Sequence, residues 1–152
     1  MSVLTAPAIN NLFGDIDMIR KIAAFATAFL LVQGVHAAEE APATVPGAKT
    51  IGVAEAKALY DKKVVFVDAR NNSDWEAGRI AGAKHLELHS DLTKENLAKI
   101  AKPGDPVVFY CNGVKCMVSP NAINKVKPWG YTNLYYLREG LPAWKAANYP
   151  VE

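Results

Sequence analysis

The chain contains two cysteines, Cys111 and Cys116, and both stand in one short stretch, FYCNGVKCMVSP, at residues 109–120. A thiol can serve as a nucleophile, as half of a disulfide, as a metal ligand or as a small buried side chain. A strand-like apolar run ends at Cys111, a loop containing Gly113 follows, and a helix-like run begins just after Cys116. The spacing therefore places Cys111 at a strand-to-helix turn.

The loop between the cysteines has the composition of an anion-binding turn. Gly113 permits backbone conformations that are closed to other residues, and successive amides in such a turn can converge on one point. The following helix adds the partial positive charge of its N-terminus, and Lys115 adds a full charge. We therefore expect the amides of residues 112–116 to cradle an anion. We also expect a lowered pKa that makes Cys111 a nucleophilic thiolate.

Alternating helical and strand patterns surround this loop. Strands are predicted for the apolar runs 64–69, 83–88, 105–111 and 133–137. Helices are predicted over 52–63, 93–101, 118–130 and 140–148, with a short helix opened by a capping box at Ser73 and Glu76. Strands separated by helices favour an α/β fold with a mainly parallel sheet covered by helices on both faces.

Polar side chains follow two of the predicted strands. Asp68 and Arg70 end the first strong strand, and Cys111 ends the next. Ligands of open α/β sheets bind beyond the carboxyl ends of the strands. The predicted fold therefore places all three residues where such proteins carry out chemistry.

Composition narrows the class of partner. Of the 152 residues, 51% are hydrophobic and 21% charged, which is typical of a globular protein with a core. The formal net charge of +2 is spread along the chain without a Lys/Arg-rich run. We therefore expect no nucleic-acid partner.

The sequence before the predicted domain divides into three parts. Residues 18–37 combine a positive start, an apolar stretch and small residues at a cleavage position, and they predict a secretory signal peptide. Residues 1–17 read as a wrongly assigned start ahead of Met18, and residues 38–50 as a proline-bearing linker. We expect a domain over 51–152 in a periplasmic or secreted protein. The apolar stretch is shorter than the roughly 20 residues of a membrane span, so no stable membrane insertion is expected after cleavage.

Four segments, in order, resemble the rhodanese-like sulfurtransferase family. VDAR at 67–70 resembles the family's strand-ending D-x-R, and WEAGRIAGAKHL at 75–86 resembles its E-x-G-H-I-x-G-A segment, with Arg79 in the place of the histidine. YCNGVKC at 110–116 resembles the active-site loop in its C-N-G-x-x-C form, and residues 130–151 resemble the closing strand and helix. The likeness implies the rhodanese fold and a transferase similar to thiosulfate sulfurtransferase.

The resemblance also implies a mechanism. Cys111 would take sulfur from thiosulfate or a persulfide donor, hold it as a persulfide, and pass it to a thiol or to cyanide. Asp68 and Arg70 would be supporting residues. We expect no cofactor and no metal, because two cysteines with His85 and His89 match no zinc spacing. The persulfide cradle implied by the family is Asn112, Gly113, Val114, Lys115 and Cys116.

Departures from the family pattern leave other functions open. Phosphatases and arsenate reductases of this fold use an arginine where this chain has Met117, so phosphatase activity is not expected. Cys116 stands where an arginine is common, and it could be a resolving thiol, a small hydrophobic residue or an electrostatic modulator. The whole protein could instead be a thiol–disulfide or persulfide redox protein that uses both cysteines, or a non-catalytic rhodanese binding module.

Overall fold

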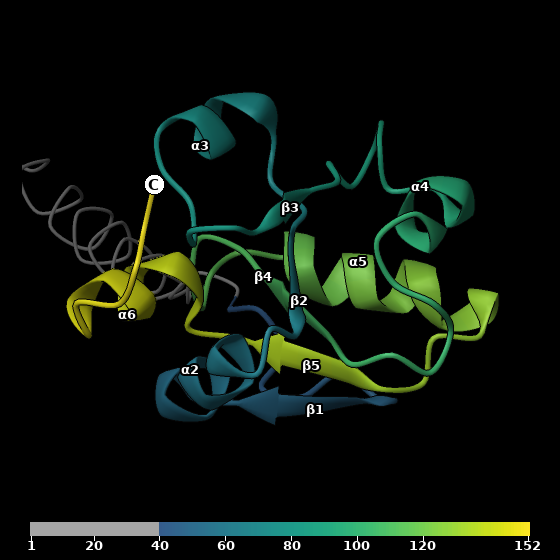
Figure 1. Cartoon of the computed structure of the whole chain (residues 1–152), viewed down its shortest axis with the longest axis horizontal. Helices are drawn as coiled ribbons and strands as arrows, with labels where there is room; N and C mark the ends of the chain where they lie inside the picture. Colours follow the sequence, from purple (N-terminus) through teal and green to yellow (C-terminus); the bar gives the residue numbers. More distant parts are fainter. Residues whose placement is uncertain (1–39) are drawn as a thin grey trace, which may run out of the picture. The chain divides into compact units, whose positions relative to one another are not determined.

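A computed structural model of the chain describes residues 40–152. The predicted start extension at 1–17 and the predicted signal peptide at 18–37 lie outside the described residues. Five parallel strands form one sheet in the order β1-β5-β4-β2-β3 (Figure 1). Their bounds are β1 Ala48–Ile51, β2 Val65–Asp68, β3 Lys84–His85, β4 Val107–Tyr110 and β5 Leu134–Leu137.

Helices connect the strands, as the alternating sequence pattern predicts. They are α2 Val53–Asp61, α3 Asn72–Glu76, α4 Lys94–Ala98, α5 Val118–Val126 and α6 Gly140–Ala146, with a 3₁₀ turn, η1, at Lys127–Trp129. The predicted helix over 118–130 is thus two pieces, because Pro128 has no amide hydrogen to continue the α-helical ladder. Within residues 40–152, no helix is long and apolar enough to cross a membrane.

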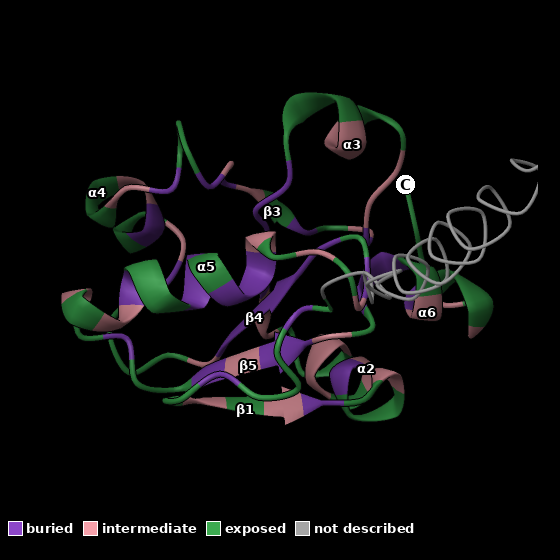
Figure 2. Ribbon diagram, turned by 180° about the vertical axis from the view of Figure 1, so that it is seen from behind, coloured by how far each residue is buried: buried purple, intermediate pink, exposed green. Residues whose placement is uncertain are grey.

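Both faces of the sheet are buried. Successive residues of β4 alternate between two hydrophobic cores. Val107 and Phe109 belong to the core beneath α4 and α5, whereas Val108 and Tyr110 belong to the core beneath α2 and α6. All four are fully buried, and Figure 2 shows β4 as a continuous buried strand. The predicted α/β fold, with a parallel sheet covered on both faces, is confirmed.

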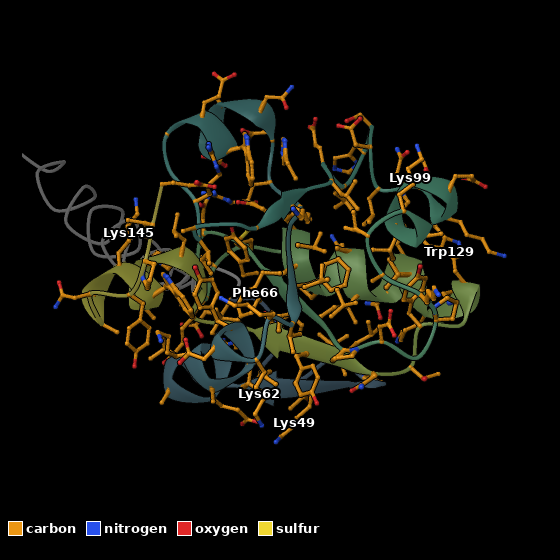
Figure 3. The ribbon with its side chains drawn as sticks, in the orientation of Figure 1. Lys49, Lys62, Phe66, Lys99, Trp129 and Lys145 are labelled. Atoms are coloured by element: carbon orange, nitrogen blue, oxygen red, sulfur yellow. The ribbon has the colours of Figure 1, made fainter. Side chains whose placement is uncertain are left out.

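An aromatic cluster fixes α6 against the sheet. The ring of Trp144 lies 5.7 Å from that of Phe66 and 5.2 Å from that of Tyr60, between ring centroids. The Trp144 indole N–H donates to the carbonyl of Pro150 at 2.8 Å. Figure 3 shows Phe66 of β2 in the interior, while Lys145, which follows Trp144 in α6, points outward. The first turn of α6 contacts the cysteine loop, which joins Cys111 to Cys116. The aromatic cluster therefore also positions this loop.

Two sequence-based expectations about the elements are wrong. The predicted linker at 38–50 includes the first three residues of β1, and Val45 within it is 2% exposed and part of the core. The α3 helix is not opened by a Ser73–Glu76 capping box. Its cap is Asn71, whose side-chain oxygen accepts from the amide of Asp74 at 2.8 Å and from the Ser73 hydroxyl at 2.7 Å.

Candidate active site

The Cys111 thiol lies at the carboxyl end of the central strand β4. Its Sγ is 3.3 Å from the carbonyl oxygen of Cys116 and 3.1 Å from Oγ of Ser119, in the first turn of α5. Cys111 and Ser119 are both fully buried. The strand end, the loop and the start of α5 therefore meet at the sulfur, where the sequence places the nucleophile.

The loop folds its second cysteine back toward the first. The Cys116 amide donates to the Gly113 carbonyl at 2.9 Å, and Gly113 has a φ of 108°, a left-handed conformation that favours glycine. Both cysteines are free thiols. The Cys116 amide is therefore occupied, contrary to the expected cradle of five amides. The amides of Gly113, Val114 and Lys115 donate to no other described residue and can still receive an anion.

Helix α6 holds the loop from outside through Gly140. The amide of Leu141 donates to the Cys111 carbonyl at 2.9 Å. Gly140 has a φ of +61°, and a Cβ there would lie 2.8 Å from the Gly113 nitrogen, closer than real contacts allow. Only glycine lets the first turn of α6 approach the loop this closely.

The pKa values of the two thiols are shifted in opposite directions. The pKa of Cys116 is lowered to about 6, first by its hydrogen bond with Cys111 and also by the amides of Asn112 and Val118, which together outweigh the effect of burial. The pKa of Cys111 is raised by the hydrogen bond with Cys116 and then by burial. The expectation of a lowered Cys111 pKa is thus wrong: the half-buried Cys116 carries the thiolate more readily than the dry Cys111.

A buried ion pair supports the loop. The Arg70 guanidinium donates to both carboxylate oxygens of Asp68, at distances from 2.6 to 3.1 Å, and to the side-chain oxygen of Asn112 at 2.8 Å. The Tyr110 hydroxyl donates to Asp68 at 2.7 Å. Arg70 is 3% exposed and Asp68 is fully buried. This geometry suits the supporting role expected for the pair.

The side chain of Asn112 faces this network and not the thiols. Its amide nitrogen donates to Asp74 at 2.8 Å while its oxygen accepts from Arg70. The contribution of Asn112 to the site is therefore its backbone amide, which acts on Cys116.

A segment that precedes β1 holds the loop at Val114. The carbonyl of Val114 accepts from the amide of Ala41 at 2.8 Å. The Ala41 carbonyl in turn accepts from the Arg138 guanidinium at 2.8 Å, and Ala41 is 1% exposed. No sequence pattern predicts these contacts, because the lead-in residues read as linker.

Lys115 stands at the edge of an open groove and is exposed. The groove holds about 390 Å³ and is lined by Asn112, Gly113, Val114, Lys115, Glu139, Pro142 and Ala143. A second groove of about 320 Å³ shares Asn112 and Pro142 and includes Lys145. The loop thus borders two surfaces that carry lysines, as binding of a small anion requires.

Two residues near Cys111 were missed by sequence reasoning. Ser119 read as part of a helix start, although its place in the first turn was the available signal. Tyr136 read as a core residue of β5. Its hydroxyl is buried and makes no hydrogen bond of acceptable geometry with the described residues.

His85 has a structural role. Its Nε2 lies 2.9 Å from the Arg70 carbonyl, and its ring stacks on Trp75 with centroids 4.6 Å apart. Within residues 40–152, no three side chains are grouped as metal ligands.

Comparison with known proteins gives one consistent answer. Residues 52–147 match the family described as the rhodanese-like domain. Thiosulfate sulfurtransferase GlpE of Pseudomonas entomophila is 31% identical over 104 residues, covering 68% of this chain and 90% of that protein. The uncharacterized protein YibN of Escherichia coli K12 is 32% identical over 106 residues, covering 68% and 71%. The BH2092 protein of Bacillus halodurans superimposes with a TM-score of 0.61 at 19% identity, covering 69% of this chain and 77% of that one. The chain therefore belongs to the rhodanese-like domain family.

Proposed function

We propose that this protein is a sulfurtransferase that moves a sulfane sulfur from thiosulfate or a persulfide donor to a thiol or cyanide. Cys111 carries the sulfur between them as a persulfide. The observation that supports this most directly is the position of the Cys111 sulfur at the end of β4. There it contacts the first turn of α5, and the three amides that follow, those of Gly113, Val114 and Lys115, donate to no residue within 40–152.

The first half of the reaction loads the carrier. Cys111 starts as the thiol and Cys116 as the thiolate, so the Cys111 proton passes to Cys116 as Cys111 attacks the outer sulfur of thiosulfate. The donor S–S bond breaks, and sulfite leaves with its electron pair. Because Cys111 is fully buried, the donor reaches its sulfur only after the loop opens.

The second half of the reaction removes the sulfur from the Cys111 persulfide. A thiolate or cyanide attacks the outer sulfur of the persulfide, and the electron pair of the S–S bond returns to Sγ of Cys111. The amides of Gly113, Val114 and Lys115 stabilise the anions in both halves, as in other preorganised anion sites. The Lys115 ammonium attracts them to the groove.

The test is an intact-mass measurement on the reduced full chain after incubation with thiosulfate. We expect a gain of one sulfur atom, which is lost on adding cyanide as thiocyanate appears. Cys111→Ser should gain none. A Cys111→Ser variant that still takes up sulfur would overturn the proposal.

A second candidate function is a dithiol redox activity. The 3.3 Å contact of Cys111 Sγ with the Cys116 carbonyl and the turn that folds Cys116 back favour it. In this scheme the Cys116 thiolate attacks Sγ of the Cys111 persulfide, releases sulfide and leaves a Cys111–Cys116 disulfide, which an external dithiol reduces. Cys116→Ser separates the two functions. It abolishes sulfide release in this scheme, whereas a sulfurtransferase loses only its proton acceptor, loads more slowly and still transfers sulfur to cyanide. A purely binding module is less well supported, because Cys111 is present as a free thiol.

We also propose that the signal peptide at 18–37 is removed and that the mature protein works in the periplasm or outside the cell. The supporting observation is the charge and hydropathy layout of that segment. Sequencing the N-terminus of the protein from a cell fraction tests this, with Ala38 the expected first residue.

A further inference from the structure

Three buried side chains lie on the α5 side of the sheet: the candidate nucleophile Cys111, Ser119 and Tyr136. Ser119 of α5 places its Oγ 3.1 Å from Sγ of Cys111. Tyr136 of β5 is the register partner of Phe109, and both belong to the core on that side. Cys111, Ser119 and Tyr136 are all 0% exposed. Both hydroxyl groups are therefore buried on the α5 side of the sheet.

The Tyr136 hydroxyl is unusual among the buried tyrosines. The Tyr131 hydroxyl donates to the carbonyl of Ala101 at 2.8 Å, and that of Tyr110 donates to Asp68 at 2.7 Å. The Tyr136 hydroxyl makes no hydrogen bond of acceptable geometry within residues 40–152. A buried hydroxyl without a partner costs free energy, so its retention calls for an explanation.

Ser119 and Cys111 are the polar neighbours of this hydroxyl. The pKa of Tyr136 is raised first by burial and then by the charge of Cys111, while an approaching Ser119 hydroxyl lowers it. Both side chains therefore act electrostatically on this hydroxyl, although neither is hydrogen-bonded to it in the resting protein.

Discharge of a persulfide creates the charge that these hydroxyls can stabilise. When the acceptor takes the outer sulfur, the electron pair of the S–S bond forms a thiolate at Sγ of Cys111, which is fully buried. Burial disfavours that charge. In the resting thiol, either Cys111 or Ser119 can be the donor of their hydrogen bond. In the thiolate only Ser119 can donate, which leaves the Ser119 oxygen free to accept from Tyr136.

We propose that Ser119 and Tyr136 form a buried hydroxyl relay that stabilises the Cys111 thiolate as the persulfide bond breaks. Ser119 donates to Sγ and is a catalytic residue, and Tyr136 donates to Ser119 and is a positioning residue. This inference rests on the proposed sulfur transfer, since it names the groups that assist its second half.

Single-turnover discharge tests the relay. The full chain is loaded with thiosulfate, freed of excess donor and mixed with cyanide, and thiocyanate release is timed. Ser119→Ala should slow release roughly 10- to 100-fold, and Tyr136→Phe roughly 3- to 10-fold, as expected for lost hydrogen bonds to a charged group. Tyr136→Phe keeps the shape of the side chain and removes an unpaired hydroxyl, so its Tm should be unchanged or higher.

Tyr131→Phe is the matched control. It removes a buried tyrosine hydroxyl that has a partner, the Ala101 carbonyl, away from the cysteines. Its Tm should fall while its discharge rate stays at the wild-type value. The two tyrosine variants should therefore show opposite patterns of stability and rate.

A spectroscopic titration distinguishes this relay from a purely structural role. In a Cys116→Ser background Cys111 is the only thiol, and the ultraviolet absorbance of its thiolate reports its pKa. Ser119→Ala and Tyr136→Phe should each raise the pH at which the thiolate forms. If Ser119→Ala does not fold, Tyr136→Phe carries the test alone.

Two negative results have separate meanings. Wild-type discharge rate and unchanged thiolate titration in Tyr136→Phe would overturn the relay. A wild-type protein that never gains sulfur would overturn the proposed transfer, while the titration would still show whether the hydroxyls stabilise the thiolate.

Discussion

The backbone amide of Ala41 donates to the carbonyl of Val114 at 2.8 Å, so a segment before β1 is hydrogen-bonded to the middle of the cysteine loop. This bond fixes the carbonyl of Val114. The same peptide group carries the Lys115 amide, whose orientation is thereby fixed as well. The lead-in residues therefore act on the shape of the site without reaching the sulfur.

Loosening this segment should slow sulfur transfer. Arg138→Met removes the guanidinium that donates to the Ala41 carbonyl at 2.8 Å and to Glu40 at 3.0 Å. We expect loading by thiosulfate to fall roughly tenfold, because misplaced amides stabilise the anion less well. Timed intact-mass spectra measure the rate of loading. Arg79→Met, which loses a partly exposed pair with Glu152, is the control and should load normally. Equal rates in both variants would show that the segment does not shape the loop.

Gly140→Ala should destabilise the protein strongly. The residue has a φ of +61°, and its Cβ would collide with the backbone of Cys111 and Gly113. We expect a loss of about 2–4 kcal/mol in the free energy of unfolding, from positive φ and the overlap together. Chemical denaturation measures this loss. Gly82→Ala is a matched control, since Gly82 has a φ of +76° but no atom within 4 Å of its Cβ position. That variant should lose only about 1 kcal/mol, and equal losses would contradict the packing argument.

Removing the charge of Asp68 should leave the Arg70 cation buried and uncompensated. Asp68→Asn is therefore expected to cost about 3–5 kcal/mol of stability. The partly exposed pair of Lys57 and Asp61, 2.6 Å apart, provides the comparison. Asp61→Asn should change the free energy of unfolding by about 0.5 kcal/mol or less. A small effect at Asp68 would mean that Arg70 finds another partner.

The reactivity of Cys116 should follow the pKa of about 6 that its surroundings produce. Below that pH the sulfur is protonated and slow to alkylate, and above it the thiolate reacts. The rate of reaction with iodoacetamide should therefore rise through pH 6 and be nearly level by pH 7. Peptide mass spectrometry assigns the modified residue.

The Cys111→Ala variant tests the cause of this shift. The hydrogen bond from Cys111 is the largest contribution to the lowered pKa of Cys116. Its removal should move the midpoint of Cys116 alkylation upward, toward the ordinary 9.0. A midpoint that stays near 6 would assign the effect to the amides of Asn112 and Val118.

The sequence was sufficient for most of the fold. The buried strands β2, β4 and β5 are short continuous runs of apolar residues, which are hard to mistake between polar turns. The edge strand β1 escaped because only Ile51 of its four residues is buried. It also follows a Pro46–Gly47 pair that reads as a turn. An edge strand forms only when it pairs with its neighbour in the sheet. The neighbour of β1 is β5, which lies near the other end of the chain.

The site was predictable in position but not in electrostatics. The strand-to-helix turn placed Cys111 correctly, because a strand end and a helix start are local features. Which thiol holds the proton depends on the interaction between the two and on which of them is more buried, and both are set by the whole fold. The meeting of Ser119 with Tyr136 is likewise long-range, since α5 and β5 are separated along the chain.

The position of β1 beside β5 has a consequence for the nascent chain. Synthesis proceeds from the N-terminus, so β1 waits without its partner until nearly the whole domain has been made. Gly140 and Leu141, which hold the cysteine loop, emerge later than the loop itself. Such long-range pairing delays folding. Until the last helix docks, both thiols lie in an unstructured loop, open to any oxidant that the chain meets during its biosynthesis.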